Sequence, residues 1–133
     1  MEYFRAKLTR TLIDFFGEDD RRIEHALRVL YHAERIAEAH AAADSDILIA
    51  AALLHDVGIK LSEERHGFNN GETQERYGPP VAERLLQAVG FPADKIEIVT
   101  RIIGNHHSPS RYGYPELAIL KQADGIVNTR EKI

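Results

Sequence analysis

The segment ILIAAALLHDVGIK, residues 47–60, gives the strongest indication of how this chain folds. Residues 47–54 are apolar on every side of a helix, so this helix should lie in the centre of a helical bundle. The run is far too short to span a bilayer. His55 and Asp56 follow it directly, and two ionisable groups beside so buried a helix are costly unless something compensates their charge. A metal ion does this well, although an isolated His-Asp pair often arises by chance.

Helical periodicity continues from this segment toward the start of the chain. In residues 3–16, apolar side chains recur at steps of three and four, as on one face of a helix, and Gly17 should end that helix. Asp19 and Asp20 can cap a second, long helix that reaches about Ala43. Each of these helices has the apolar stripe that is typical of packing on a core.

The pattern is weaker after the central helix. Residues 57–78 contain four glycines and little periodicity, which predicts a long, partly irregular connection. Pro79 and Pro80 suit the start of a fourth helix, and Gly90 suits its end. Two more helices follow, and a polar loop over residues 105–114 separates them. No stretch alternates as a strand does, so the sequence predicts an all-α fold.

Composition and charge exclude several classes of protein. The 133 residues are 44% hydrophobic and 29% charged, which is ordinary for one domain with its own core. Cysteine is absent, so the chain can form neither a disulfide nor a thiolate metal site. The net charge of −4 and the lack of long charged or apolar runs predict no nucleic-acid partner and no membrane segment, and residues 1–10 lack the apolar core of a signal peptide. We therefore expect a cytoplasmic protein, a compact bundle of about six helices that forms a single domain over residues 1–133.

Two further polar residues stand in comparable helical settings. His25 lies one turn inside the second helix, and Asp124 ends the apolar stripe LAILKQAD on the last helix. Taken singly, each is more often a core or surface residue than a metal ligand. Together with His55 and Asp56, they give two imidazoles and two carboxylates on three helices, and helix bundles build metal sites from inward side chains in this way. Such a mixed nitrogen and oxygen set suits Mn, Fe, Co, Ni or Zn.

These residues carry a resemblance to the HD superfamily of metal-dependent phosphohydrolases. HALRV begins at His25, AALLHDVGIK contains the pair His55-Asp56, and ILKQAD ends at Asp124, so the match covers roughly residues 20–128. The resemblance implies an HD-domain-like bundle and a divalent transition metal held by these four residues. It implies one ion, with a second as the alternative. It also implies hydrolysis of a phosphate ester of a small molecule, often a nucleotide, by water that the metal activates.

Another pair of histidines, His106-His107, stands in the loop NHHSPSRYGYP, residues 105–115. A polar loop with two exposed histidines is one interpretation, but many HD proteins that hold two metals carry histidines here. The YGYP sequence has a distant resemblance to the GYP-type HD phosphodiesterases, which hydrolyse cyclic dinucleotides. The chain departs from them at Ser108, where that subfamily has Glu, and at Lys60, which comes one residue later. Cyclic-dinucleotide hydrolysis is therefore the alternative activity, and a non-catalytic metal or nucleotide-binding module is another.

The resemblance also suggests roles for charged residues near the pair. We expect Asp56 and Lys60 to be catalytic: Asp56 would hold the ion and orient the attacking water, and Lys60 would neutralise charge that develops on phosphate oxygens. Arg28 lies one turn after His25 and could reach the same cavity. With Lys60, His106 and His107, it completes the candidate phosphate-binding set. For Lys60 and Arg28, a solvated surface position is an equally open interpretation.

The segment between the central helix and the two prolines holds further titratable residues whose roles stay open. His66 and Glu75 could reach a second metal or act as a general acid, or they could belong to a hydrated loop. For Glu72 the hydrated loop is the favoured interpretation. We expect the partner to be a small-molecule phosphoester, while the sequence leaves the oligomeric state undetermined.

Overall fold

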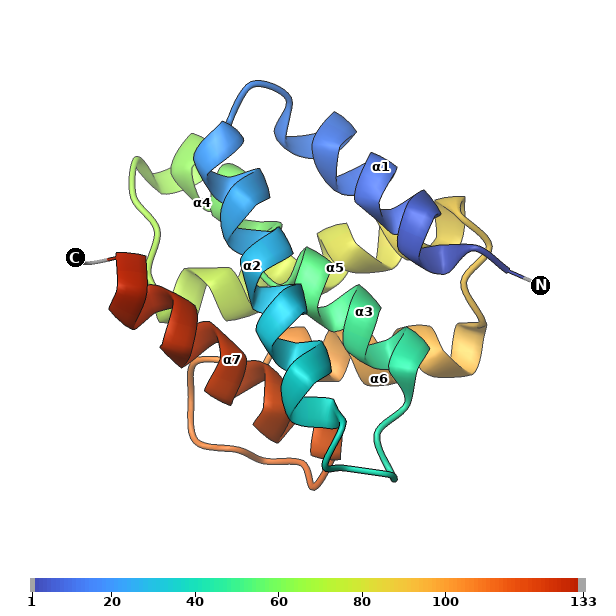
Figure 1. The fold of residues 1–133 in the computed structure, drawn as a ribbon. Coiled ribbons are helices and arrows are strands. Elements are labelled where there is room, and N and C mark those ends of the chain that lie inside the picture. Colours follow the sequence, from blue (N-terminus) through green and yellow to red (C-terminus); the bar gives the residue numbers. More distant parts are fainter. Residues whose placement is uncertain (1, 132–133) are drawn as a thin grey trace.

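The computed structural model describes residues 2–131, and this part of the chain contains seven helices and no strand. They are α1 (Phe4–Phe16), α2 (Asp20–Ala37), α3 (Ser45–Leu54), α4 (Gly58–His66), α5 (Gly71–Ala88), α6 (Ala93–Ile103) and α7 (Pro115–Glu131). The predicted all-α fold, a compact bundle of helices, is confirmed (Figure 1). None of the described helices is both long and apolar enough to cross a membrane.

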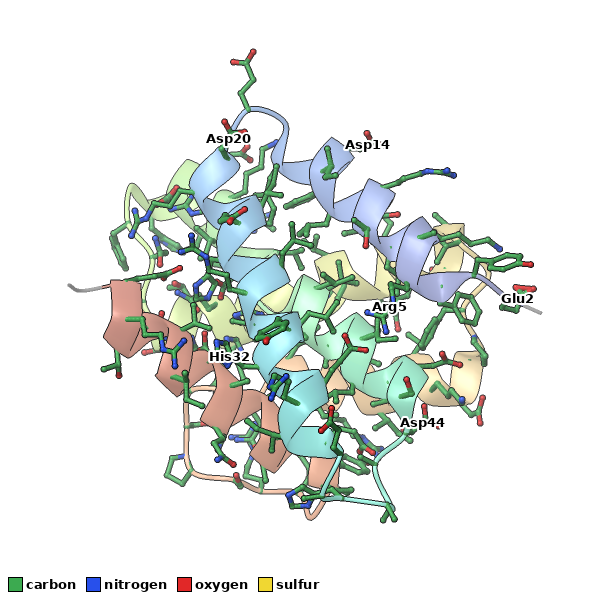
Figure 2. The ribbon with its side chains drawn as sticks, viewed as in Figure 1. Glu2, Arg5, Asp14, Asp20, His32 and Asp44 are labelled. Atoms are coloured by element: carbon green, nitrogen blue, oxygen red, sulfur yellow. The ribbon has the colours of Figure 1, made fainter. Side chains whose placement is uncertain are left out.

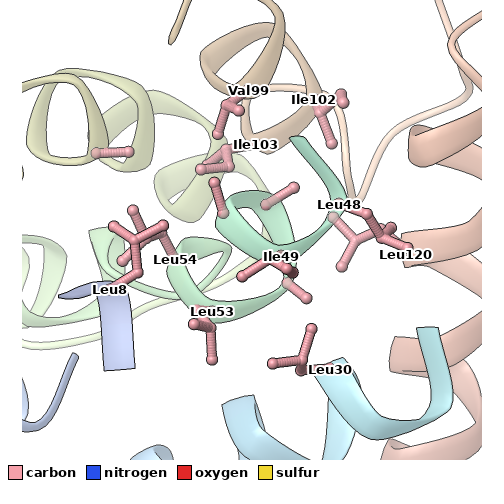
Figure 3. Close-up of a cluster of buried hydrophobic side chains, with 14 of the residues drawn as sticks. Leu8, Leu30, Leu48, Ile49, Leu53, Leu54, Val99, Ile102, Ile103 and Leu120 are labelled. Atoms are coloured by element: carbon pink, nitrogen blue, oxygen red, sulfur yellow. The ribbon is translucent and has the colours of Figure 1, made fainter. Parts of the chain in front are cut away.

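Helix α3 occupies the centre of the bundle, as its sequence predicts. Every residue from 47 to 54 is buried, and α3 contacts α1, α2, α6 and α7 (Figure 1). Asp44 caps the helix, because its carboxylate accepts a hydrogen bond from the Ile47 N–H at 3.0 Å. Figure 3 shows side chains that point from α3 to several neighbouring helices: Leu48, Ile49, Leu53 and Leu54, surrounded by Leu8, Leu30, Ile103 and Leu120. Burial on all sides fixes where α3 ends, and so fixes the position of the polar pair that follows it.

Helix α2 lies across α3 and packs along α7 (Figure 1). Its predicted cap is confirmed, since the Asp19 carboxylate accepts a hydrogen bond from the Arg22 N–H at 3.4 Å. The helix ends at Ala37, earlier than the predicted end near Ala43. The residues that follow Ala37 are largely exposed. They bury no apolar face, and helix propensity alone does not extend a helix into solvent.

The prediction of an irregular connection over residues 57–78 is wrong. Helix α4 begins at Gly58 and ends before Gly67, whose positive φ of 77° suits a glycine, and α5 begins at Gly71. Asn70 caps α5 through a reciprocal pair of hydrogen bonds with Thr73. The two prolines that suggested a helix start lie inside α5.

Two glycines in this segment mark a close helix crossing, although they looked like loop signals. A Cβ on Gly58 would lie 2.5 Å from the backbone nitrogen of Gly78, and a Cβ on Gly78 would lie 2.7 Å from the side chain of Ile103. Only glycine allows α4 and α5 to approach so closely. Gly78 also precedes the prolines, and without a Cβ it avoids part of the steric clash that proline imposes on the residue before it. The glycines therefore reflect tertiary packing.

Candidate metal centre

The four predicted ligands meet where α2, α7 and the end of α3 converge. The Nε2 atom of His25 lies 3.0 Å from Asp124 Oδ1 and 3.4 Å from Asp56 Oδ2. The Nε2 atom of His55 lies 3.3 Å and 3.4 Å from the same two oxygens. His25, His55 and Asp56 can each offer one ligand atom, with all three atoms within 4.8 Å of one another. The structure thus brings together the set that the sequence analysis selected.

The hydrogen bonds around the two imidazoles turn their Nε2 atoms toward the carboxylates. His55 Nδ1 lies 2.7 Å from the carbonyl oxygen of Ala52, and His25 Nδ1 lies 2.9 Å from Glu131 Oε1. Both partners can only accept, so each ring has a proton on Nδ1, and its Nε2 faces the carboxylates and has a free lone pair for a metal when it is unprotonated. His55 Nε2 is buried and makes no hydrogen bond within the described structure. Lone pairs that face carboxylates need a cation between them, so this donor set fits a divalent metal ion.

The electrostatics of the cluster also favour a positive charge at its centre. Burial lowers the pKa of His55, but the Asp56 and Asp124 carboxylates outweigh burial and raise it to about 9. Burial raises the pKa of Asp124, yet its contacts with His25 and His55 hold that pKa well below the ordinary range. The His25 pKa is raised as well, because the Asp124 hydrogen bond and the carboxylate charges outweigh burial and the neighbouring His55. A bound divalent ion would supply the positive charge that protons supply otherwise.

His106 extends this cluster on the far side of Asp56. Its Nδ1 donates to the carbonyl oxygen of Ile103 at 2.5 Å, and its buried Nε2, 3.9 Å from Asp56 Oδ1, makes no hydrogen bond within the described structure. Burial and the nearby His55 lower the pKa of His106 to about 4, so the imidazole is neutral and can act as a ligand. Asp56, His106 and His107 form a second group of potential ligands. The predicted phosphate-binding histidines therefore lie beside the metal set, and Asp56 belongs to both groups.

Glu75 holds the loop that carries these histidines. Its Oε2 accepts hydrogen bonds from the N–H groups of His107 and Ser108, at 2.9 and 2.8 Å. Burial raises the Glu75 pKa, but these bonds outweigh burial and lower it, so the carboxylate stays ionised. His107 also bonds Gln74 through Nε2. These contacts give Glu75 a structural role, in which α5 holds the loop against the centre.

The other undetermined residues of the middle segment lie away from the cluster. His66 bonds the Tyr77 hydroxyl at 2.7 Å and is exposed, and Glu72 is exposed in the first turn of α5. Neither residue lines the cavity at the centre. Both residues therefore lie on the surface, although on helices and not in the predicted hydrated loop.

A cavity of about 450 Å³ opens onto the metal cluster. Three candidate ligands, His25, Asp56 and Asp124, line it together with His107. The rest of the lining is mostly polar and consists of Arg21, Arg22, Ile59, Glu63, Asn69, Gln74, Asn128 and Glu131. Its volume falls in the range of about 300–1,000 Å³ that is typical of small-molecule sites.

The structure does not bring Lys60 and Arg28 into this cavity, so their predicted placement needs correction. Lys60 lies on the outer side of α4, where its ammonium stands 5.4 Å from the centre of the Phe15 ring. The prediction treated residues 57–78 as irregular, but the helical turn that begins at Gly58 points Lys60 outward. Arg28 is exposed and borders a separate hollow behind Glu131. It is one turn from His25, but on the side away from the cavity.

Two arginines that the sequence analysis missed line the cavity instead. Arg21 and Arg22 precede His25 by four and three residues, so they lie one helical turn before it on a similar face. The Arg22 guanidinium makes a two-point contact with Glu63, at 3.2 and 3.1 Å. No ion pair ties Arg21 to a carboxylate within residues 2–131. The spacing to His25 is the signal that could have found them, since the cavity opens toward the start of α2.

Comparisons with known proteins agree with this geometry. The family model of the HD domain matches residues 22–129, more than half of the chain. The chain therefore belongs to the HD domain family. It is also similar to a predicted HD superfamily hydrolase from an uncultured Thermotogales bacterium, whose crystal structure is 26% identical with a TM-score of 0.68; the match covers 96% of this chain and 73% of that one. A search of curated proteins gave no match. Neither matching comparison points to the GYP-type phosphodiesterases.

Proposed function

We propose that this chain is a metal-dependent phosphohydrolase that cleaves a phosphate ester of a small molecule, such as a nucleotide. The observation that carries the proposal is the convergence of His25, His55, Asp56 and Asp124 on a polar cavity. Membership of the HD domain family and similarity to a predicted HD superfamily hydrolase support it. A purely structural cluster would need protonated histidines between the carboxylates, and a divalent ion would supply the same positive charge.

The four ligands would hold one divalent ion through the two Nε2 atoms and the two carboxylates. When bound, the ion would polarise a phosphate oxygen and make a water molecule more acidic. Asp56 is positioned to orient that water, because it is partly exposed to the cavity and lies between the His25–His55 group and His106. The second group, which includes exposed His107, offers a position for a second ion as the alternative.

The arginines at the start of α2 would bind the phosphate. Arg22 is pre-oriented, because Asp19 and Glu63 hold its guanidinium, and Arg21 can turn toward the ligand. Guanidinium groups match phosphate oxygens and stabilise the charge that develops on them during hydrolysis. Amide side chains of Asn69 and Asn128 would bind the rest of the molecule. No Phe or Tyr stands among the cavity-lining residues of the described structure, so selectivity would rest on hydrogen bonds.

A metal analysis followed by a substrate screen tests the proposal. The purified protein should contain a transition metal and release phosphate from a nucleotide or sugar phosphate when Mn²⁺, Co²⁺ or Ni²⁺ is added. Asp56→Ala should lose both metal and activity. Asp14→Ala is the matched control, because Asp14 is an exposed aspartate on α1 that does not line the cavity (Figure 2 shows Asp14). Fast cleavage of a cyclic dinucleotide with little action on mononucleotides would favour the alternative activity. Metal-loaded protein that turns over neither class would favour the binding module.

A further inference from the structure

The three buried histidines at the centre are oriented in two different ways. His55 and His106 follow the ends of α3 and α6, and each donates its Nδ1 proton to the carbonyl oxygen three residues earlier. Carbonyls in the last turn of a helix are free to accept such bonds. His25 lies inside α2, where the backbone carbonyls are already used within the helix. Its Nδ1 therefore needs a side-chain partner.

Glu131 at the end of α7 is that partner. Its two carboxylate oxygens lie 2.9 and 3.2 Å from His25 Nδ1. The Glu131 side chain is 27% exposed and is therefore partly shielded from solvent. Arg28 approaches it from outside, with Nη1 3.9 Å from Glu131 Oε2, while its Nη2 lies 3.4 Å from Glu24. Arg28, Glu131 and His25 therefore form a chain of contacts that leads from the surface to the cluster.

We propose that Glu131 is a positioning residue for the metal centre, an inference that rests on the metal-binding part of the proposed function. The carboxylate fixes the His25 proton on Nδ1, sets the orientation of the ring and turns Nε2 toward Asp56 and Asp124. A carboxylate on the outer nitrogen also makes the inner nitrogen a stronger ligand. Arg28, predicted to bind phosphate, instead lies beside Glu131 on the solvent side, with Nη1 3.9 Å from Oε2. Asp124 and Glu131 lie two turns apart, so α7 supplies both a ligand and the group that orients another ligand.

A competing explanation is that Glu131 only joins α7 to α2 and leaves the metal unaffected. Titration of the protein with Zn²⁺ in a calorimeter separates the two explanations. Glu131→Leu should weaken Zn²⁺ binding by about 10–100-fold, as loss of such outer partners does. Glu131→Gln keeps an oxygen that can accept from Nδ1 and should recover part of the affinity. Glu24→Gln is the matched control, because Glu24 contacts Arg28 and neighbours His25 in sequence but has no contact with its ring; it should bind Zn²⁺ as the wild type does.

The outcomes distinguish the metal centre itself from the role of Glu131. If the wild-type protein does not bind Zn²⁺, the metal centre and the role of Glu131 both fail. If the wild type binds Zn²⁺ and Glu131→Leu binds it equally well, only the role of Glu131 fails, even if the melting temperature falls.

A second measurement needs no variant that must fold. In the Zn²⁺-loaded wild type, nitrogen–proton NMR correlations of the imidazoles should show His25 protonated on Nδ1 and unprotonated on Nε2. The reverse tautomer would overturn the proposal. In Glu131→Gln the Nδ1 proton should remain but shift and exchange faster with water, because a neutral acceptor holds it less strongly.

Discussion

Replacing Gly58 with alanine tests whether the crossing of α4 and α5 holds His55 and Asp56 in position. At an ordinary helix position, Gly→Ala stabilises a protein by about 0.5–1 kcal/mol. Here the new Cβ would lie 2.5 Å from the Gly78 nitrogen and 2.9 Å from the Gln74 carbonyl oxygen. Both are backbone atoms that no rotamer change can move, and overpacking of this kind costs about 1–3 kcal/mol, occasionally more. The clash should win, with a net loss of about 1–2 kcal/mol.

This loss should appear in both stability and metal binding. For a chain of this size it corresponds to a fall in melting temperature of roughly 3–8 °C by circular dichroism. Because Gly58 is two residues after Asp56, the displaced turn should also weaken Zn²⁺ binding. The control is Gly125→Ala, at a helical glycine next to Asp124 where an added Cβ meets nothing within 4 Å. That change should raise the melting temperature slightly. A Gly58→Ala protein that melts as high as the wild type would show that the crossing tolerates a Cβ at this position.

Three further predictions follow from the site and its surroundings. Removing the metal with a chelator should lower the melting temperature. If free metal had been at 100 times its Kd, the loss of stability would be about 2.7 kcal/mol. Identical melting curves, from a sample shown beforehand to contain metal, would contradict this. Arg21→Ala should lower kcat/KM with metal content unchanged, whereas Lys60→Ala should leave both unchanged, because only Arg21 lines the cavity; the reverse pattern in steady-state kinetics would restore Lys60 to the site. Burial raises the pKa of Asp44, but hydrogen bonds from the Ile47 N–H and Lys95 outweigh burial and lower that pKa. The ionised carboxylate therefore stabilises the fold above a pH of about 4, and this contribution is lost as the pH falls further. Asp44→Asn should therefore lower the melting temperature more at pH 7 than at pH 3, and an equal gap at both pH values would rule this out.

The central helix and the four candidate metal ligands could be predicted from the sequence, because both depend on local patterns. Residues 47–54 are apolar all round, which only a central helix satisfies. The four candidate ligands could be selected because each is a polar residue in an otherwise apolar helical context. The structure then places His25, His55, Asp56 and Asp124 together, as predicted.

The features that the sequence did not predict depend on contacts between distant segments. Glycines such as Gly58 and Gly78 are common in loops. Their role in a helix crossing becomes visible only in the structure, where α4 and α5 lie in contact. The outward direction of Lys60 depended on recognising α4 as a helix. Glu131 is 106 residues from His25, and a lone glutamate at the end of a helix gives no sign of such a partner. Helical periodicity places Arg21 one turn before His25, but nothing in the sequence shows in which direction the cavity opens.

The contact between His25 and Asp124 joins positions that are 99 residues apart. An ion held by both would act as a crosslink between α2 and α7, in a chain that has no cysteine to form a disulfide. Local unfolding of α7 would then require release of the ion, because the helix cannot leave the bundle while Asp124 remains a ligand. The amide hydrogens of α7 should accordingly exchange with solvent more slowly as metal occupancy rises. Metal binding and local unfolding of α7 would therefore be coupled, so a measurement of one would report on the other.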